Sequence, residues 1–349
     1  MGFGAGVRKR LNSHFGLRPL LIDGAIEFEK TYMNTKPTLL GLSLTAVFCS
    51  GAQAAEPFVT SGLAISAFET ARAVRESADE RMTRAVTDTE RADGGNIWLE
   101  LKGGTDEADG MGRSAGFDND LAIVNLGADI RRGDAFFGVV YTYGRADTES
   151  RGAETKADGK ADLFGITAFG ERNFGGLNLG VSAGWLWVEG DSKTGGAWHE
   201  TNANIITFDA AARYDIVAGP LQVVPYAKVE YTLFRPRVHG NWELDNANIW
   251  QFPVGVNAAW TFKFAGGSTL HPEIDAAVIR TAGDTEFDSR DAHGRVYSET
   301  LTGSHTLYRA QAAIAWTAGK GSLKAVYRYL GSDQGRESHN YQLKAGYTF

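Results

Sequence analysis

The sequence predicts an all-β fold, in which twelve antiparallel strands close into a barrel and an N-terminal α-helix lies in its lumen. Three observations predict this fold. From residue 95 onward, stretches of about ten residues alternate between apolar and polar side chains. The connections between these stretches are short and long in turn. The 349-residue chain is rich in glycine (43 residues) and in aromatic residues (Phe 19, Tyr 12, Trp 8) but has only 8 prolines, which favours strands joined by tight turns.

The stretch at residues 250–262 shows the alternation most clearly. Apolar side chains occupy every second position, whereas Gln251, Asn257 and Thr261 lie between them. Because successive side chains of a strand point to opposite faces, one face is apolar and the other polar. The twelve stretches centre near Leu99, Val124, Val140, Ile166, Ala183, Ala210, Val229, Val256, Ala276, Ala313, Tyr327 and Ala345.

The connections indicate a barrel that crosses a membrane. The short ones are residues 132–134, 173–176, 217–220, 265–267 and 318–321, and the long ones are residues 104–116, 147–160, 190–201, 236–249, 281–305 and 331–337. Outer-membrane barrels have short periplasmic turns and long extracellular loops, and lipid requires spanning strands to close on themselves. A soluble barrel is the alternative, but twelve strands enclose more space than side chains fill. We therefore expect residues 95–349 to form a monomeric barrel in a Gram-negative outer membrane.

The N-terminal region has the pattern of an export signal. Residues 33–54 combine a short basic start, an apolar run and an Ala-x-Ala ending, which predicts a signal peptide read by the Sec translocon and cleaved after Ala54. Residues 1–32 are then a mis-called upstream extension, and residues 55–62 a short residual N-terminus. The one cysteine, Cys49, lies in the signal, so the exported chain has no disulfide. The net charge of −7 argues against nucleic acid as a partner.

Residues 63–88 predict a helix within a linker spanning residues 63–94, because they lack glycine and proline and are rich in Ala, Glu and Arg. The helix has no wide apolar stripe, so it fits a polar lumen lined with carboxylates better than lipid or a dry core. We expect its arginines to meet inward-facing acids. The arginines are Arg72, Arg75, Arg81 and Arg84, and the acids are Glu100, Asp129, Asp209, Glu230, Glu273 and Asp275. A solvated periplasmic helix is the alternative.

The last strand carries a pattern that outer-membrane barrels typically show. Apolar and aromatic residues alternate to the final position, at Tyr341, Leu343, Tyr347 and Phe349. We interpret these four residues as the signal that the barrel assembly machinery reads.

The sequence contains no pattern that identifies a catalytic or metal-binding site. No His and Cys residues have a metal-ligand spacing, so we expect no cofactor. Asp288, Asp291 and His293 share the longest loop and leave a hydrolytic barrel as an alternative, although acidic, His-containing extracellular loops are common.

Several segments together resemble the autotransporter translocator domain of type V secretion, over roughly residues 63–349. They are residues 98–104, 116–118, 124–129, 141–144, 224–227 and 343–349, with Gly138. The resemblance implies that the barrel and its helix help to move an N-terminal passenger across the outer membrane, in contact with its lipid and lipopolysaccharide. It implies no intrinsic catalysis.

The sequence departs from this family in two ways. Few residues lie between Ala55 and the helix, which leaves no room for a folded passenger. Residues 61–95 contain no asparagine, so self-cleavage by a helix asparagine is not supported. We therefore expect an orphan translocator-type barrel with a helix-plugged lumen, serving surface display or secretion. The alternative is a general pore, or an adhesion barrel that makes contact through residues 281–305.

Overall fold

The computed structural model describes residues 61–83, 93–109, 116–151, 157–194, 197–238, 243–284, 286–290, 296–300 and 304–349. The chain divides into two compact units, Met1–Gly51 and Ala52–Phe349, and every described residue belongs to the second. The predicted signal peptide and its cleavage after Ala54 lie outside the described residues and stay predictions.

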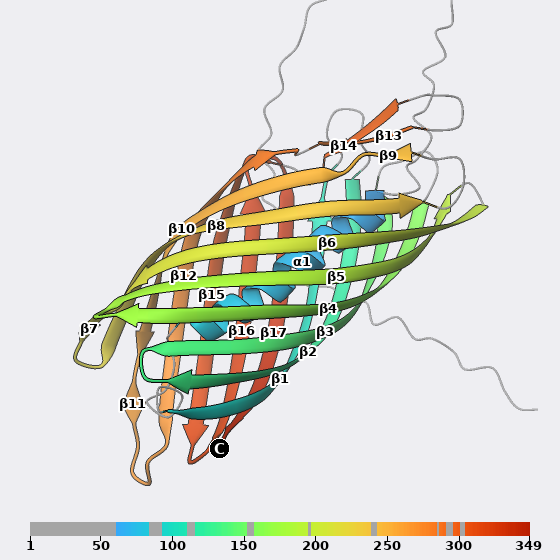
Figure 1. Ribbon diagram of the computed structural model, residues 1–349. Helices are drawn as coiled ribbons and strands as arrows, with labels where there is room; N and C mark the ends of the chain where they lie inside the picture. Colours follow the sequence, from blue (N-terminus) through green and yellow to red (C-terminus); the bar gives the residue numbers. More distant parts are fainter. Residues whose placement is uncertain are drawn as a thin grey trace, which may run out of the picture. The chain divides into compact units, whose positions relative to one another are not determined.

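Among the described residues, twelve long strands form a closed antiparallel ring (Figure 1). The first long strand pairs with the last, and the seventh pairs with the eighth, so the ring has no open edge. Each predicted centre falls in a different strand, which confirms the twelve-stranded barrel. The strands are β1 Gly94–Ala108, β2 Gly116–Arg132, β3 Ala135–Arg151, β4 Ala157–Phe174, β5 Leu177–Thr194, β6 Ala197–Tyr214, β8 Leu221–Val238, β10 Ala247–Trp260, β12 Thr269–Gly283, β15 Thr306–Ala318, β16 Gly321–Ser332 and β17 Arg336–Thr348.

Five short strands complete the described sheets. β7 (Ile216–Ala218) and β11 (Phe262–Lys263) pair with β8 and β12 at one end of the barrel. β9 (Glu243–Leu244), β13 (Glu286–Arg290) and β14 (Val296–Thr300) form a separate three-stranded sheet. The chain therefore builds a second small sheet from two connections, the one between β8 and β10 and the longest one, between β12 and β15.

The two faces of the barrel wall differ as the alternation predicts. In β17, Tyr341 is 60% exposed, whereas the neighbouring Gln342 is 7% exposed and faces the lumen. In β12, Ile274 is exposed, whereas Glu273 and Asp275 on either side of it are buried. An apolar outer wall and a polar interior therefore follow from the strand periodicity.

The five predicted short connections are the turns at one end of the barrel, which we call the turn end; the opposite end is the loop end. Each turn contains a glycine with a positive φ angle, such as Gly133 (+59°) and Gly319 (+57°). This left-handed conformation is costly for residues that carry a Cβ atom. Glycine thus sets the sharp reversals on which the strand order depends.

The strands run further toward the loop end than predicted. Residues 190–201 were expected to be a loop, but β5 continues to Thr194 and β6 begins at Ala197. The sequence pattern failed here because Glu189, Asp191 and Lys193 are polar on the exposed face. The alternation of apolar residues ends before the pairing of the two strands ends, because hydrogen bonding between strands does not require apolar side chains.

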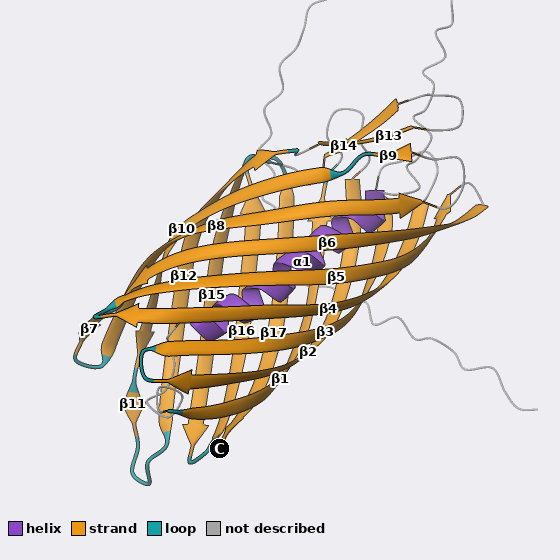
Figure 2. Ribbon diagram, viewed as in Figure 1, coloured by secondary structure: helices purple, strands orange, loops and turns teal. Residues whose placement is uncertain are grey.

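The helix α1 (Ser61–Met82) runs inside the ring of strands, drawn purple in Figure 2. It packs mainly against β2 to β6 and β8. Glu69 contacts Arg336 at the loop end, and Arg81 contacts Asp129 near the turn end, so the helix runs from loop end to turn end. No helix in the described ranges is long and apolar enough to cross a membrane.

The helix ends earlier than predicted. It was expected to reach residue 88, but it ends at Met82, and Thr83 forms a bend whose N–H donates to the Asp79 carbonyl (2.7 Å). A β-branched residue at this position favours termination. Residues 84–92, including Arg84, lie outside the described residues.

Candidate functional site

The first half of the helix, residues 67–74, packs in an apolar environment. Ala67, Phe68, Ala71 and Val74 are buried in a cluster with inward-facing side chains near the loop end of β2 to β10. The barrel contributes Leu121, Ile123, Ala146, Ala161, Leu163, Leu186, Val188, Ala203, Ile205, Phe234, Ala247 and Ile249. We call this set the apolar cluster.

The apolar cluster corrects the expectation of a lumen that is polar throughout. In this part of the wall both faces of the strands are apolar: Leu186 and Val188 point inward, whereas Trp185 and Trp187 are exposed outside. Unbroken apolar runs such as residues 185–188 were the sequence feature that could have revealed it. A run of this kind indicates a strand that is covered on both faces.

The second half of the helix, residues 75–82, is held by polar and charged contacts. Arg81 makes the best-formed of these, because its guanidinium contacts both oxygens of Asp129 at 2.7–2.9 Å. Asn96 and Trp98 also donate to this carboxylate, each at 2.9 Å. Four donor nitrogens thus surround this buried carboxylate, and their hydrogen bonds offset the cost of removing it from water.

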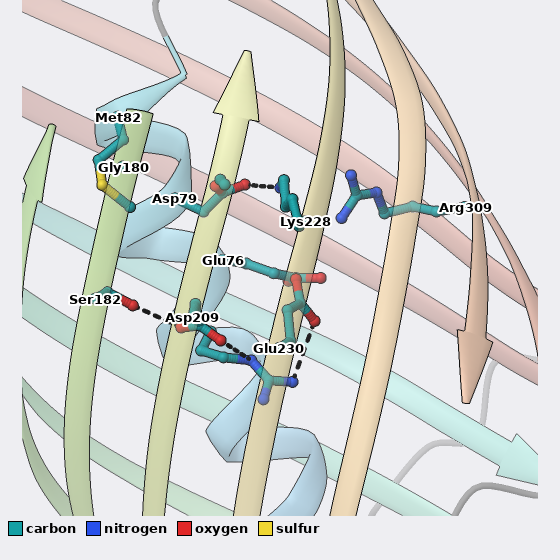
Figure 3. A pocket seen from close by; sticks show the side chains of 11 residues that line it. Glu76, Asp79, Met82, Gly180, Ser182, Asp209, Lys228, Glu230 and Arg309 are labelled. Atoms are coloured by element: carbon teal, nitrogen blue, oxygen red, sulfur yellow. Dashed lines mark hydrogen bonds and ion pairs between the residues drawn. The ribbon is translucent and has the colours of Figure 1, made fainter. Parts of the chain in front are cut away.

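Arg75 reaches two acids of the barrel wall, Asp209 and Glu230, which are labelled in Figure 3. Its guanidinium lies 3.6 Å from Asp209 and 3.5 Å from Glu230, and it donates to Gln251 at 3.2 Å. Asp209 also accepts a hydrogen bond from Ser182 (2.6 Å). Arg75 therefore links the helix to β6, β8 and β10.

Four of the residues named from sequence do not make the expected contact. Arg72 pairs with Glu69 of its own helix and donates a hydrogen bond to the barrel residue Ser338 at 3.5 Å. Glu273 and Asp275 pair with barrel bases, Lys324 (2.8 Å) and Arg309 (3.1 Å). These acids lie on β12, away from the strands on which the helix packs, so bases of neighbouring strands neutralise them first.

Glu100 also meets no arginine of the helix. It instead accepts a hydrogen bond from the helix hydroxyl of Ser77 and from Asn125 at 2.8 Å. Lys344 lies 3.2 Å from the same carboxylate. Lys102 bridges the two elements, because its ammonium donates to the Ala73 carbonyl (2.6 Å) and to the Ser77 hydroxyl (2.9 Å).

Sequence reasoning missed the contacts of opposite polarity, in which helix acids meet barrel bases. Asp79 lies between Arg213 and Lys228, and Figure 3 shows its pairing with Lys228. Glu80 pairs with Lys324 at 2.7 Å. Glu76 and Glu69 pair with Arg328 and Arg336. These bases lie at inward-facing strand positions, as the barrel acids do, so the same reasoning would have found them.

Helix and wall leave little free space beside Glu76, Asp79 and Lys228. The cavity lined by residues such as Glu76, Asp79 and Lys228 has a volume of about 10 Å³, room for about one water molecule. No group of His, Cys, Asp and Glu in the described ranges could hold a metal ion. The arrangement thus positions a helix in the lumen, against β2 to β6 and β8.

A closed ring of twelve strands with an apolar outer wall and a charged interior defines a β-barrel of the outer membrane. The family model of the autotransporter β-domain matches residues 97–328, more than half of the chain. The chain therefore belongs to the autotransporter β-domain family, the non-catalytic translocator of type V secretion in the Gram-negative outer membrane.

Solved structures show the same fold. The chain is similar to the translocator domain of the autotransporter NalP from Neisseria meningitidis, with a TM-score of 0.61 and 17% identity, over 84% of this chain and 100% of that one. It is also similar to the β-domain of the Bordetella autotransporter BrkA, with a TM-score of 0.59 and 13% identity, over 74% of this chain and 100% of that one. Comparison with curated protein sequences found no match.

Proposed function

We propose that this translocator barrel holds the segment before Ser61 at the cell surface, and that α1 then closes the lumen. The direction of the helix carries the proposal. Its first turn lies toward the loop end, whereas β1 begins at the turn end. Because short turns face the periplasm in such barrels, the chain preceding the helix leaves toward the outside.

The packing of the helix supports its role as a plug. The apolar cluster surrounds one side of residues 67–74 near the loop end. Ion pairs from β2, β6, β8 and β16 hold residues 75–82. We expect such a helix to restrict the passage of water and ions along the lumen, because the cavity beside Asp79 and Lys228 has room for about one water molecule.

The partners of the barrel belong to the proposal as well. Export would use the Sec translocon, and insertion the barrel assembly machinery, with Tyr341, Leu343, Tyr347 and Phe349 as the assembly signal. All four side chains are exposed on the outer wall of the last strand, where another protein can read them before lipid covers them. The finished monomer would contact outer-membrane lipid and lipopolysaccharide.

Planar-bilayer conductance tests the plug. Deleting residues 61–83 is expected to raise single-channel conductance by roughly an order of magnitude, because twelve strands enclose more space than their own side chains fill. Deleting residues 286–300, most of the small separate sheet, is the matched control and leaves conductance unchanged. Equal conductance of the full chain and the helix deletion would refute the plug.

Labelling of intact cells tests the orientation separately. A Thr60→Cys variant is expected to react with a membrane-impermeant maleimide in whole cells, since position 60 lies just before the helix. Reaction only after the outer membrane is permeabilised would reverse the proposed direction.

The sheet of β9, β13 and β14 favours a second function, contact with a surface through the long connection at residues 281–305. This sheet gives that connection a fixed backbone. Of the residues behind the hydrolytic alternative, Asp291 and His293 lie outside the described residues. Adhesion of cells that express the 286–300 deletion, compared with the full chain, tests this function.

A further inference from the structure

The outer wall carries an apolar groove across β3 to β10, away from the lumen. Its volume is about 760 Å³. The floor is made of small residues on three neighbouring strands, namely Ala168, Gly170, Ala183 and Ala210. Ala168 lies directly opposite Ala183, and Gly170 and Ala210 lie on either side of Val181, which also lines the groove.

Aromatic side chains form the two sides of this groove. On one side, Phe208, Tyr231 and Trp250 occupy paired positions on β6, β8 and β10, with ring centroids 6.5 Å and 4.6 Å apart. On the other side, Phe137 of β3 lies against Gly170, where a Cβ atom would come within 3.0 Å of its ring. The glycine thus lets the ring lie close to the wall and leaves the hollow between the two aromatic sides.

Two arginines lie at the turn end of the groove. Arg132 and Arg172 are exposed on the outer wall, and both flank Ala135, two residues before Phe137. The Arg172 guanidinium lies 5.3 Å from the centre of the Phe174 ring. Within the described part of the chain, neither arginine is in an ion pair with an acid. Guanidinium groups bind phosphate through two parallel hydrogen bonds.

We propose that this groove binds one phospholipid of the periplasmic leaflet, with an acyl chain between the aromatic sides and the phosphate at Arg132 and Arg172. The occupant follows from location. The groove is part of the wall that faces membrane hydrocarbon, and a gap left there would forfeit dispersion contacts on three sides. The leaflet follows from the arginines, since the turn end faces the periplasm.

Native mass spectrometry of the processed barrel with added phosphatidylethanolamine tests the proposal. Wild type is expected to keep one lipid after the annular lipids are stripped. Ala183→Phe fills the floor and lowers the retained fraction about tenfold, equivalent to about 1.4 kcal/mol. Ala312→Phe, at an exposed alanine of β15 outside the groove, is the matched control and retains the lipid. The double variant Arg132→Gln and Arg172→Gln loses it to a similar degree.

Other outcomes overturn the assignment. Equal retention by wild type and Ala183→Phe would refute the groove, and a dimer disrupted by Ala183→Phe would make the occupant a second barrel. Preferential retention of lipid A would refute the periplasmic leaflet, and equal retention of dioleoylglycerol would refute phosphate binding. Heat-modifiable gel mobility verifies folding. If Ala183→Phe does not fold, Ala210→Leu and the double arginine variant decide the question.

Discussion

Two parts of α1, residues 67–74 and residues 75–82, are held in the lumen by different mixtures of contacts. Residues 67–74 bury Phe68 and Val74 in the apolar cluster and add one ion pair with the barrel, from Glu69 to Arg336. Residues 75–82 instead place Arg75, Asp79 and Arg81 among charges of the barrel. Apolar contact excludes water and tolerates small shifts, because it has no direction. Ion pairs between buried groups form only when the helix has one rotation about its axis and one height in the lumen. We infer that the first half supplies most of the docking free energy and that the second half fixes the register of the helix.

The largest expected effect comes from a charge in the apolar half. Phe68→Asp is expected to weaken docking of α1 by about 5 kcal/mol, because it removes a buried aromatic side chain and leaves an unpaired carboxylate. The open probability of single channels in planar bilayers measures this change. The conservative Phe68→Leu is the control, with a cost below about 1.5 kcal/mol. An open probability of Phe68→Asp equal to wild type would show that the apolar cluster does not hold the helix.

A smaller effect is expected from the best-formed ion pair. Arg81→Ala removes both contacts to Asp129 but leaves the hydrogen bonds from Asn96 and Trp98. We expect a loss of about 3 kcal/mol, at the lower end for a broken buried pair. Arg81→Lys, which keeps the charge but cannot form the two-point contact, should restore only part of it. If the lysine variant behaved as wild type in the same recordings, charge alone would explain the contact, and a role in register would be wrong.

The smallest effect sharpens the comparison, because it concerns an arginine whose ion pair lies within its own helix. Arg72→Ala should change docking by about 1 kcal/mol, the net worth of one hydrogen bond, since Glu69 keeps its contact with Arg336 and the contact with Ser338 is long. Thermal unfolding and open probability are both expected to stay close to wild type. A loss comparable to that of Arg81→Ala would mean that helix charge as a whole, rather than particular pairs, holds α1.

The barrel itself could be predicted closely from the sequence. Alternation over residues 250–262 placed Phe252 and Val254 outside and Gln251 inside, and the exposures agree. The five glycine-containing turns were also found, because a positive φ angle restricts the choice of residue. Strand ends at the loop end were not found, as Thr194 and Ala197 show, since polar strands carry no apolar rhythm.

The lumen could be predicted only in part. That arginines of the helix meet inward-facing acids, as Arg81 and Arg75 do, follows from parity and a helix in the lumen. The pairing of Glu273 with Lys324 instead of the helix does not follow from parity, because the helix lies off centre, against β2 to β6 and β8. A list of inward-facing charges gives the possible partners of each arginine but not their distances.

The sequence alone determined that this chain is a closed barrel with an apolar outside, because a period of two and the needs of a backbone in lipid permit little else. The tertiary structure decided which charges meet, where the lumen becomes apolar, and where four small residues leave a groove on the outer wall. These features depend on the stagger between strands and on the position of the helix, which bring together residues more than a hundred positions apart, such as Asp79 and Lys228.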